Sequence, residues 1–351
     1  MTTEKILFIQ FKFLGDAIFL TPVLQAYKEH FPEKELHILV SQESAPLLSN
    51  LDYIDKVWAF PRIRGKLNLF NSIRILLKLR SLNFDFSFDF VGNDRGSIIT
   101  RFISAKKRIG VLRRSSNFLQ KSAYQIKVYT DHSPLSYIDF NKYIIQKGLN
   151  FKFIKNLPKM KIFPDHFSFL KAKKIFEGNF ILCHVSTTQD KKQWALDNWI
   201  NLYRLSEKSK LPLLFSAGPS SSEQSLLIQL KRIIPKANIL SPINDIKIFI
   251  ALLSRANLLI SNDSGPLHFA AAMNVKVIGL FGPDDSVRRA APIYKIKEKL
   301  IGKKCECLGD LGRKHFCSAK NRCIDSVKPI DVFHLIKKRI KSPQSTIKLW
   351  V

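Results

Sequence analysis

Asp16 and the stretch Ser261–His268 contain residue types that chemistry on a phosphorylated substrate requires. Asp16 follows Gly15 at the expected start of a helix, where a carboxylate within reach of a substrate hydroxyl could act as a general base. In the Ser261–His268 stretch, Gly265 lets the backbone approach a ligand, and the N–H groups of a helix start bind anions. His268 lies one helical turn further on and could donate a hydrogen bond to phosphate.

The loop His184–Trp194 follows another expected strand and is rich in hydroxyl groups and positive charge. Thr187 and Thr188 offer hydroxyl donors, and Lys191 and Lys192 offer ammonium groups. Together they could hold phosphate oxygens and offset the charge that develops on a leaving group.

Glu223 lies at the start of the helix that follows a Gly-Pro turn. A carboxylate at this place could accept hydrogen bonds from ribose hydroxyls, as acidic residues do in other nucleotide-binding folds. Ordinary structural explanations compete with each of these roles. From the residues alone, an N-cap is the simpler explanation for Asp16, a solvated surface residue for Glu223, and a polar surface loop for His184–Trp194. No single loop decides the function.

These loops depend on strands and helices that alternate in both halves of the chain. In the first half, short apolar or alternating runs predict strands at 5–11, 35–40, 56–60 and 84–90, and helices from the turn at 12–16 to about 30, at 45–51 and at 137–147. In the second half, strands are expected at 179–185, 212–216, 257–260 and 276–281, and helices at 197–209, 221–233, 246–254, 265–273 and 330–340.

This rhythm predicts an α/β protein with two doubly wound, Rossmann-like domains in tandem. A length of 351 residues suits two domains better than one. We expect the first domain at residues 1–160, the second at 165–330, and a C-terminal helix and tail at 331–351. The Pro-punctuated basic stretch 156–164 is the candidate linker.

The excess of basic residues indicates that the binding partners are anionic. With 57 Lys and Arg against 28 Asp and Glu, the net charge is +29, which favours nucleic acid, an anionic membrane or a phosphorylated substrate. Nucleic acid is disfavoured because no zinc finger, helix-turn-helix or RNP signature occurs. No apolar run is long enough to span a bilayer and no signal peptide is recognisable, so we expect a cytoplasmic protein that can dock on the anionic inner face of the membrane.

The five cysteines do not form a standard zinc motif. Four of them, Cys305, Cys307, Cys317 and Cys323, are spaced C-x-C-x9-C-x5-C, which lacks the two-residue gap of a common knuckle. The odd count and the lack of an export signal favour reduced thiols over a disulfide framework, although a structural metal stays open.

Taken together, the four loops resemble those of glycosyltransferase family 9, the lipopolysaccharide heptosyltransferases. The matching segments occur in order over nearly the whole chain and are FLGDAIFLTPVLQAYKEHFP, HVSTTQDKKQW, the Gly-Pro turn followed by Glu223, and SNDSGPLHFAAAMNVKVIGLFGPDD. The resemblance implies the GT-B arrangement, in which two Rossmann-like domains face each other across a cleft. The N-terminal domain would bind the acceptor and the C-terminal domain the nucleotide sugar.

Carried over by residue, the resemblance implies a catalytic base at Asp16 and a lysine that balances the departing diphosphate at Lys192. The residues that would bind the donor are Thr187, Thr188, Glu223, Asp263, Ser264, Gly265 and His268. The reaction would be an inverting transfer of heptose from ADP-heptose, with no second catalytic carboxylate, no metal and no cofactor.

The acceptor implied by the resemblance is the inner core of lipopolysaccharide (Kdo–lipid A type), which is anionic through its Kdo and phosphate groups. Plausible contacts in the first domain are Lys12, Arg62, Arg64, Arg95, Arg113 and Arg114. We expect a monomer. A related glycosyltransferase with another nucleotide sugar or glycan acceptor is the main alternative, and a nucleic-acid-binding protein is a weaker one.

Overall fold

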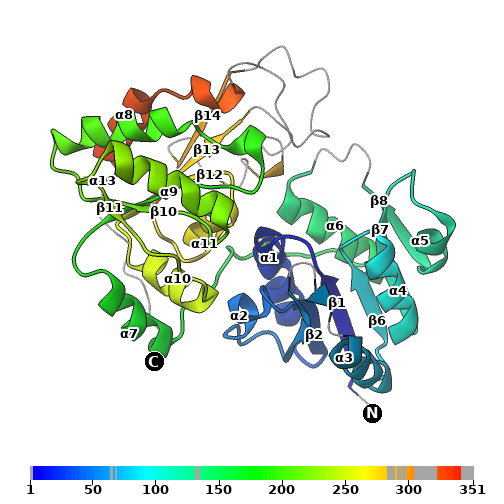
Figure 1. Cartoon of the computed structure of the whole chain (residues 1–351). Helices are drawn as coiled ribbons and strands as arrows, with labels where there is room; N and C mark the ends of the chain where they lie inside the picture. Colours follow the sequence, from blue (N-terminus) through cyan, green and yellow to red (C-terminus); the bar gives the residue numbers. More distant parts are fainter. Residues whose placement is uncertain are drawn as a thin grey trace. The chain divides into compact units, whose positions relative to one another are not determined.

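The chain forms two compact units, residues 1–162 and 163–351, each described here by itself (Figure 1). The structure is a computed structural model, which describes residues 3–63, 66–67, 69–130, 135–282, 289–290, 294, 298–303 and 322–340; side chains at 62–69 are not described.

A six-stranded parallel sheet forms the centre of the first unit. Its strands lie in the order β3-β2-β1-β6-β7-β8, the doubly wound order that diverges from a central pair. The strands are β1 (Lys5–Gln10), β2 (Glu35–Ser41), β3 (Lys56–Phe60), β6 (Phe86–Asp89), β7 (Lys107–Leu112) and β8 (Ile126–Tyr129). A short antiparallel pair, β4 (Arg62–Ile63) and β5 (Lys66–Leu67), follows β3.

Helices cover both faces of this sheet (Figure 1). They are α1 (Leu14–His30), α2 (Ala45–Leu48), α3 (Leu69–Ser81), α4 (Asp94–Ile103), α5 (Phe118–Ser122) and α6 (Tyr137–Leu149). Because side chains alternate along a strand, Phe8 of β1 packs edge-on against Tyr27 of α1, whereas Leu7 and Ile9 share a cluster with Leu79 of α3. The sheet is therefore buried on both sides.

The second unit repeats this topology. Its parallel sheet has the order β11-β10-β9-β12-β13-β14, so the prediction of two doubly wound α/β domains is confirmed. The strands are β9 (Ile181–His184), β10 (Leu213–Ser216), β11 (Asn238–Ile239), β12 (Leu258–Asn262), β13 (Val277–Phe281) and β14 (Lys299–Ile301). The helices are α7 (His166–Ile175), α8 (Leu196–Glu207), α9 (Ser221–Ile233), α10 (Ile246–Ser254), α11 (Gly265–Ala272) and α13 (Pro329–Ile340), with 3-10 turns η1 (Asp190–Lys192) and η5 (Cys323–Ser326).

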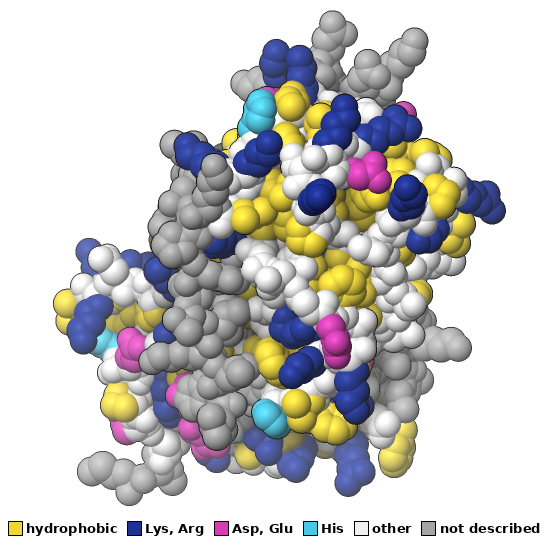
Figure 2. All heavy atoms as spheres, turned by 90° about the vertical axis from the view of Figure 1, so that its left-hand side faces the viewer, with side chains coloured by type: hydrophobic (Ala, Val, Ile, Leu, Met, Phe, Trp, Pro, Cys, Tyr) yellow, Lys and Arg dark blue, Asp and Glu magenta, His cyan; other side chains and the backbone are white. Residues whose placement is uncertain are grey.

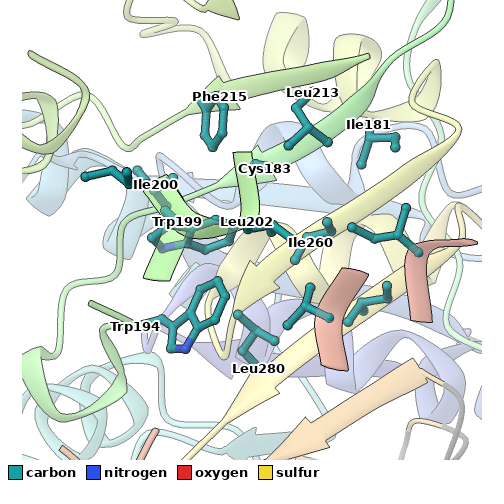
Figure 3. Packing of buried hydrophobic residues seen from close by; sticks show 14 of the residues in the cluster. Ile181, Cys183, Trp194, Trp199, Ile200, Leu202, Leu213, Phe215, Ile260 and Leu280 are labelled. Atoms are coloured by element: carbon teal, nitrogen blue, oxygen red, sulfur yellow. The ribbon is translucent and has the colours of Figure 1, made fainter. Parts of the chain in front are cut away.

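Two tryptophans anchor the core of the second unit (Figure 3). Trp194 and Trp199 are both fully buried, and their rings meet edge to face with centroids 4.9 Å apart. The indole N–H of Trp194 donates to the carbonyl of Val327 at 2.9 Å, which satisfies its one polar atom. Because Trp194 ends the loop that carries Lys192, this packing fixes the end of a candidate functional loop.

Some local expectations differ from the structure. No helix was expected directly after the strand at 84–90, but α4 begins at Asp94. Asn93 caps it, and the Asn93 side chain accepts a hydrogen bond from the Gly96 N–H at 3.1 Å. Gly15 lies inside the first turn of α1 and not in a loop before it. Helices α3, α4, α5 and α7 and strands β4, β5, β7, β8, β11 and β14 were not predicted.

Cysteine chemistry needs one correction. Cys323 is disulfide-bonded, whereas the sequence favoured reduced thiols. The expectation was wrong at this residue because an odd cysteine count and the lack of an export signal do not tell which sulfurs the fold brings together. Cys305, Cys307 and Cys317, the other members of the spaced set, lie outside the described residues.

Basic side chains are spread over the surface. On the face shown in Figure 2, Lys and Arg side chains lie among apolar patches, with only a few Asp and Glu side chains between them. Within the described ranges, no helix has both the length and the apolar character that crossing a bilayer requires.

Candidate functional site

The candidate donor site lies at the carboxyl edge of the second sheet. Strands β9, β10 and β12 are neighbours and parallel, so the loops that follow them meet at one edge. These loops lead to η1, α9 and α11. All the residues that were expected to bind the donor lie in these loops or in the first turn of the helices that follow them. Thr187, Thr188 and the catalytic candidate Lys192 follow β9, Glu223 follows β10, and the Ser261–His268 stretch lies at the end of β12 and the start of α11.

A buried ion pair joins two of these loops. The Nζ of Lys192 lies 2.5 Å from the Oδ2 of Asp263, and the Asp263 side chain is almost fully buried. The other carboxylate oxygen, Oδ1, faces the Nε2 of His268 at 3.6 Å. Asp263 follows β12 directly, and Lys192 ends η1, so a contact across 71 residues holds the lysine at the edge of the sheet.

His268 is a neutral imidazole in this environment. Burial lowers its pKa to about 4, against the opposing effect of the Asp263 carboxylate. Its Nδ1 lies 2.5 Å from the hydroxyl of Tyr294, whose own pKa is raised well above its ordinary value by burial. The Asp263 carboxylate that faces Nε2 can only accept a hydrogen bond, which favours the tautomer with its proton on Nε2; in that tautomer Nδ1 accepts from the Tyr294 hydroxyl. His268 thus buttresses Asp263 and carries no positive charge at neutral pH.

Glu223 is held by a second network on the neighbouring loop. Its Oε1 accepts from the Ser186 hydroxyl at 3.0 Å and its Oε2 accepts from the Ser220 hydroxyl at 2.6 Å. The same Ser186 oxygen accepts from the N–H of Gly218 at 2.8 Å. A Cβ on Gly218 would lie 2.2 Å from the Glu223 carboxylate, so the carboxylate keeps this position only beside a glycine. The solvated-glutamate explanation for Glu223 does not hold, because its carboxylate is fixed by two hydroxyls.

The loop after β9 is braced by amide side chains that the sequence did not single out. The Thr187 N–H donates to the side-chain oxygen of Gln193 at 3.1 Å, and the Trp194 N–H donates to the side-chain oxygen of Asn262 at 3.2 Å. The Asn262 amide in turn donates to the carbonyl of Val185 at 3.1 Å. Thr187 is half-buried and Thr188 is exposed, so both hydroxyls lie near the loop surface.

Helix α11 presents its N-terminus at the same edge. Ser264 is its N-cap residue in extended conformation, and its hydroxyl lies 3.0 Å from that of Ser261. No side-chain hydrogen bond caps this helix start, and Pro266 stands in its first turn, where its lack of an N–H costs nothing. The remaining N–H groups of the first turn, with the helix dipole, favour an anion beside Gly265.

In the first unit, Asp16 lies in the first turn of α1. Phe13 is the N-cap residue, and the Asp16 Oδ2 accepts the Phe13 N–H at 3.1 Å from the third helical position. The capping hypothesis therefore holds in a modified form, because Asp16 reaches back to the cap residue without being it. Its side chain is only partly buried, so a substrate can approach it.

The basic residues proposed for the acceptor also follow the carboxyl ends of strands. Lys12 follows β1, Arg95 lies in the first turn of α4 after β6, and Arg113 and Arg114 follow β7. Because these strands are parallel, the four residues share the edge of the sheet at which Asp16 lies. Arg62 opens β4 after β3, with no side chain described, and Arg64 lies outside the described residues.

A buried carboxylate at this edge was missed by the sequence analysis. Asp89 ends β6, and burial raises its pKa to about 6. Its Oδ2 accepts the hydroxyl of Tyr124 at 2.5 Å and its Oδ1 accepts the N–H of Val91 at 2.7 Å. Both hydrogen bonds and the positive charge of Lys12 lower the pKa of Asp89, but burial has the larger effect. Its place at the end of the strand expected at 84–90 could have identified Asp89 as a candidate.

Two doubly wound, Rossmann-like units are the fold of the GT-B class of glycosyltransferases, and the second unit carries a helix N-terminus, a lysine and a fixed carboxylate at one edge of its sheet. The family model for "Glycosyltransferase family 9 (heptosyltransferase)" matches residues 73–319. The chain belongs to glycosyltransferase family 9, and it is a glycosyltransferase. The resemblance stated from the sequence is thereby confirmed.

Individual relatives agree with this assignment. The chain is 27% identical to the lipopolysaccharide heptosyltransferase 1 of Campylobacter coli, over 95% of this chain and 98% of that protein. Among solved structures, it is similar to a family 9 glycosyltransferase from Veillonella parvula (TM-score 0.75, 16% identity, covering 96% of this chain and 97% of the other). It is also similar to the ADP-heptose lipopolysaccharide heptosyltransferase II of Escherichia coli (TM-score 0.73, 14% identity, 96% and 98%).

Proposed function

We propose that this protein transfers heptose from ADP-heptose to the inner core of lipopolysaccharide with inversion at the anomeric carbon. The observation that carries the proposal is the Lys192–Asp263 pair at the carboxyl edge of the second sheet, beside the N-terminus of α11. The names of the similar proteins, which are lipopolysaccharide heptosyltransferases, support the choice of donor and acceptor.

The second unit binds the nucleotide in this proposal. Glu223 accepts hydrogen bonds from the ribose hydroxyls in exchange for those from Ser186 and Ser220. The diphosphate lies against the first turn of α11 at Ser264 and Gly265, with the hydroxyls of Thr187 and Thr188 as further donors. His268 and Asp263 hold Lys192 in place.

The chemical step needs one base and one cation. Asp16 takes the proton of the acceptor hydroxyl, whose oxygen forms the new bond to the anomeric carbon of the heptose. The bond from that carbon to the diphosphate oxygen breaks at the same time, and ADP leaves with the electron pair. The Lys192 ammonium stabilises the charge that develops on the diphosphate, so no metal is required.

The first unit binds the acceptor. Lys12, Arg95, Arg113 and Arg114 lie at the edge of the sheet that carries Asp16, and their charges complement the phosphates and carboxylates of the lipopolysaccharide inner core. Arg62 and Arg64 extend the same set. We place the protein in the cytoplasm as a monomer that works at the inner face of the membrane.

Product analysis tests this proposal directly. The protein is incubated with ADP-heptose and with a panel of other nucleotide sugars, each against lipopolysaccharide acceptors truncated at successive core positions. We expect a mass increase of one heptose with ADP-heptose alone, on an acceptor that ends in Kdo or in the first heptose. Transfer of a different sugar would show that the proposed donor is wrong, although the proposed mechanism could still apply. If neither ADP nor any other nucleoside diphosphate at millimolar concentration raises the melting temperature, the nucleotide site itself is wrong.

A further inference from the structure

Helices α3, α4 and α5 lie in a row on one side of the first unit's sheet, and they expose several large apolar side chains. Contacts join α3 to α4 and α4 to α5, while α1 and α6 cover the opposite side (Figure 1). The large apolar side chains exposed on this row, named here the α3–α5 face, include Phe70, Ile73, Leu77, Ile98, Phe102 and Phe118.

The exposed stripe on α3 is separate from the part of the helix that stabilises the fold. Phe70, Ile73 and Leu77 are spaced three and four residues apart, so they share one side of the helix, and they are 77%, 54% and 54% exposed. Leu79 of the same helix is fully buried in the core cluster. The helix is thus apolar on two sides, and only the inner side is needed for packing.

The segment that carries this stripe is strongly basic. Residues 61–130 contain 15 Lys and Arg and only three acidic residues. The three carboxylates are engaged: Asp85 pairs with Lys106 at 2.7 Å, Asp89 is buried, and Asp94 accepts amide hydrogen bonds from Asn117 and Gln120. The cations on helices α3, α4 and α5 are Arg74, Lys78, Arg80, Arg95, Arg101 and Lys121.

Cations and apolar side chains on this face are in contact. The guanidinium of Arg80 donates to the carbonyl of Phe102 at 2.6 Å and lies 5.5 Å from the centre of its ring. The ammonium of Lys78 lies 5.5 Å from the Trp58 ring. This combination of exposed aromatic and aliphatic groups with basic residues is typical of helices that lie in the headgroup region of a bilayer.

We propose that the α3–α5 face binds the surface of an anionic lipid bilayer. The stripe Phe70, Ile73 and Leu77 enters the boundary between headgroups and acyl chains, and Arg74 and Lys78 contact lipid phosphates. A second copy of this chain is a poorer occupant, because it would bring two strongly basic surfaces together. The inference rests on the proposed function, which places the protein at the membrane, and adds the face that binds the bilayer; its test needs neither donor nor acceptor sugar.

Vesicle sedimentation with the full-length chain tests this inference. The probes are vesicles of phosphatidylethanolamine with phosphatidylglycerol, and vesicles of phosphatidylcholine alone. We expect binding to the anionic vesicles only, and weaker binding as salt increases. The double variant Ile73→Ser/Leu77→Ser is expected to lose at least about tenfold in affinity. The matched control is Ile228→Ser/Ile233→Ser on α9, where both side chains are similarly exposed, and it should bind as the parent does.

Transfer to a delipidated, soluble acceptor separates this proposal from the proposed function. The Ile73→Ser/Leu77→Ser variant should keep parental turnover on that acceptor, because neither residue belongs to the transfer machinery. The inference is overturned if this variant binds anionic vesicles as well as the parent, or if the control loses binding equally. It is also overturned if the parent binds both kinds of vesicle alike, or if the substitutions abolish a dimer and leave lipid binding unchanged.

Discussion

The Lys192 ammonium lies 2.5 Å from the Asp263 carboxylate, in a pair that joins the loop after β9 to the loop after β12. Removing water from two charges is costly, and the pair is tolerated because the charges neutralise each other and Asp263 also faces His268. A buried pair of this kind is weak evidence for stability and better evidence for function, because it keeps a cation at a helix N-terminus where diphosphate can displace part of its interaction.

Replacing Lys192 should separate the contribution of the ion pair to stability from its contribution to turnover. We expect Lys192→Met to lower kcat about 100- to 1,000-fold, because the departing diphosphate loses its cation, and to lower the melting temperature, because Asp263 is left buried and unpaired. Adding Asp263→Asn should restore much of the stability without restoring turnover. Steady-state kinetics give kcat for both variants, and thermal unfolding gives their melting temperatures.

Lys191 is the matched control for this prediction. It is adjacent in the sequence, and the spacing of HVSTTQDKKQW alone does not distinguish the two lysines. Lys191→Met should reduce kcat less than about tenfold. If Lys191→Met were the inactive variant and Lys192→Met the active one, the role of Lys192 would pass to its neighbour.

Asp16 can be tested without disturbing the helix that it starts. Asn at this position keeps an oxygen that can accept the Phe13 N–H, so Asp16→Asn should change the unfolding free energy by less than about 1 kcal/mol. It cannot accept a proton, so transfer should fall at least about 100-fold. ADP affinity, measured by calorimetry, should not change. Turnover near the parental value would require another base.

The fold was predictable where local pattern and burial agree. The longer strands and most helices of the second half follow from short apolar runs and helical spacing, because a parallel sheet between helices buries its strands completely. Helix α3 was missed because Phe70, Ile73 and Leu77 are apolar on its exposed side. Apolar residues on two sides of a helix erase the periodicity on which a prediction depends.

The candidate site was predictable as a set of loops but not as a set of contacts. The types of Lys192, Glu223 and Asp263 indicated their chemistry, yet the Lys192–Asp263 pair spans 71 residues and follows only from the strand order. Asp89 was missed because the local sequence pattern predicts the wrong environment for it. Alternation in FDFSFDF suggests one solvated side, whereas a sheet with helices on both faces buries Asp89 as fully as its phenylalanine neighbours.

Gly218 provides a test of the nucleotide contact. A methyl group there would lie 2.2 Å from the Glu223 Oε1 and would push that carboxylate away from Ser186 and Ser220. We expect Gly218→Ala to raise KM for the donor about tenfold with a smaller change in kcat, as expected for a binding contact. Gly282→Ala is the control, since its methyl would make an ordinary contact 3.7 Å from the Lys191 carbonyl. Equal KM values for both variants would remove Glu223 from the donor site.

The buried carboxyl of Asp89 should make stability depend on pH in a direction opposite to that of an ordinary ion-paired carboxylate. Burial raises its pKa from 3.8 to about 6 in the folded protein. Between these values the folded state holds a proton that the unfolded state has lost, so the unfolding free energy decreases as the pH rises through this window. Above about pH 6 the contribution of Asp89 is constant and unfavourable.

Comparison with Asp89→Asn isolates this contribution. His184 and His268, whose pKa values burial lowers to about 4, act in the opposite direction as the pH falls, but they are common to both proteins. The variant should therefore gain about 2–3 kcal/mol relative to the parent between pH 4 and pH 7, measured by urea unfolding. A stability difference that is the same at both pH values would mean that Asp89 titrates near its ordinary value and that the Tyr124 and Val91 hydrogen bonds fully offset its burial.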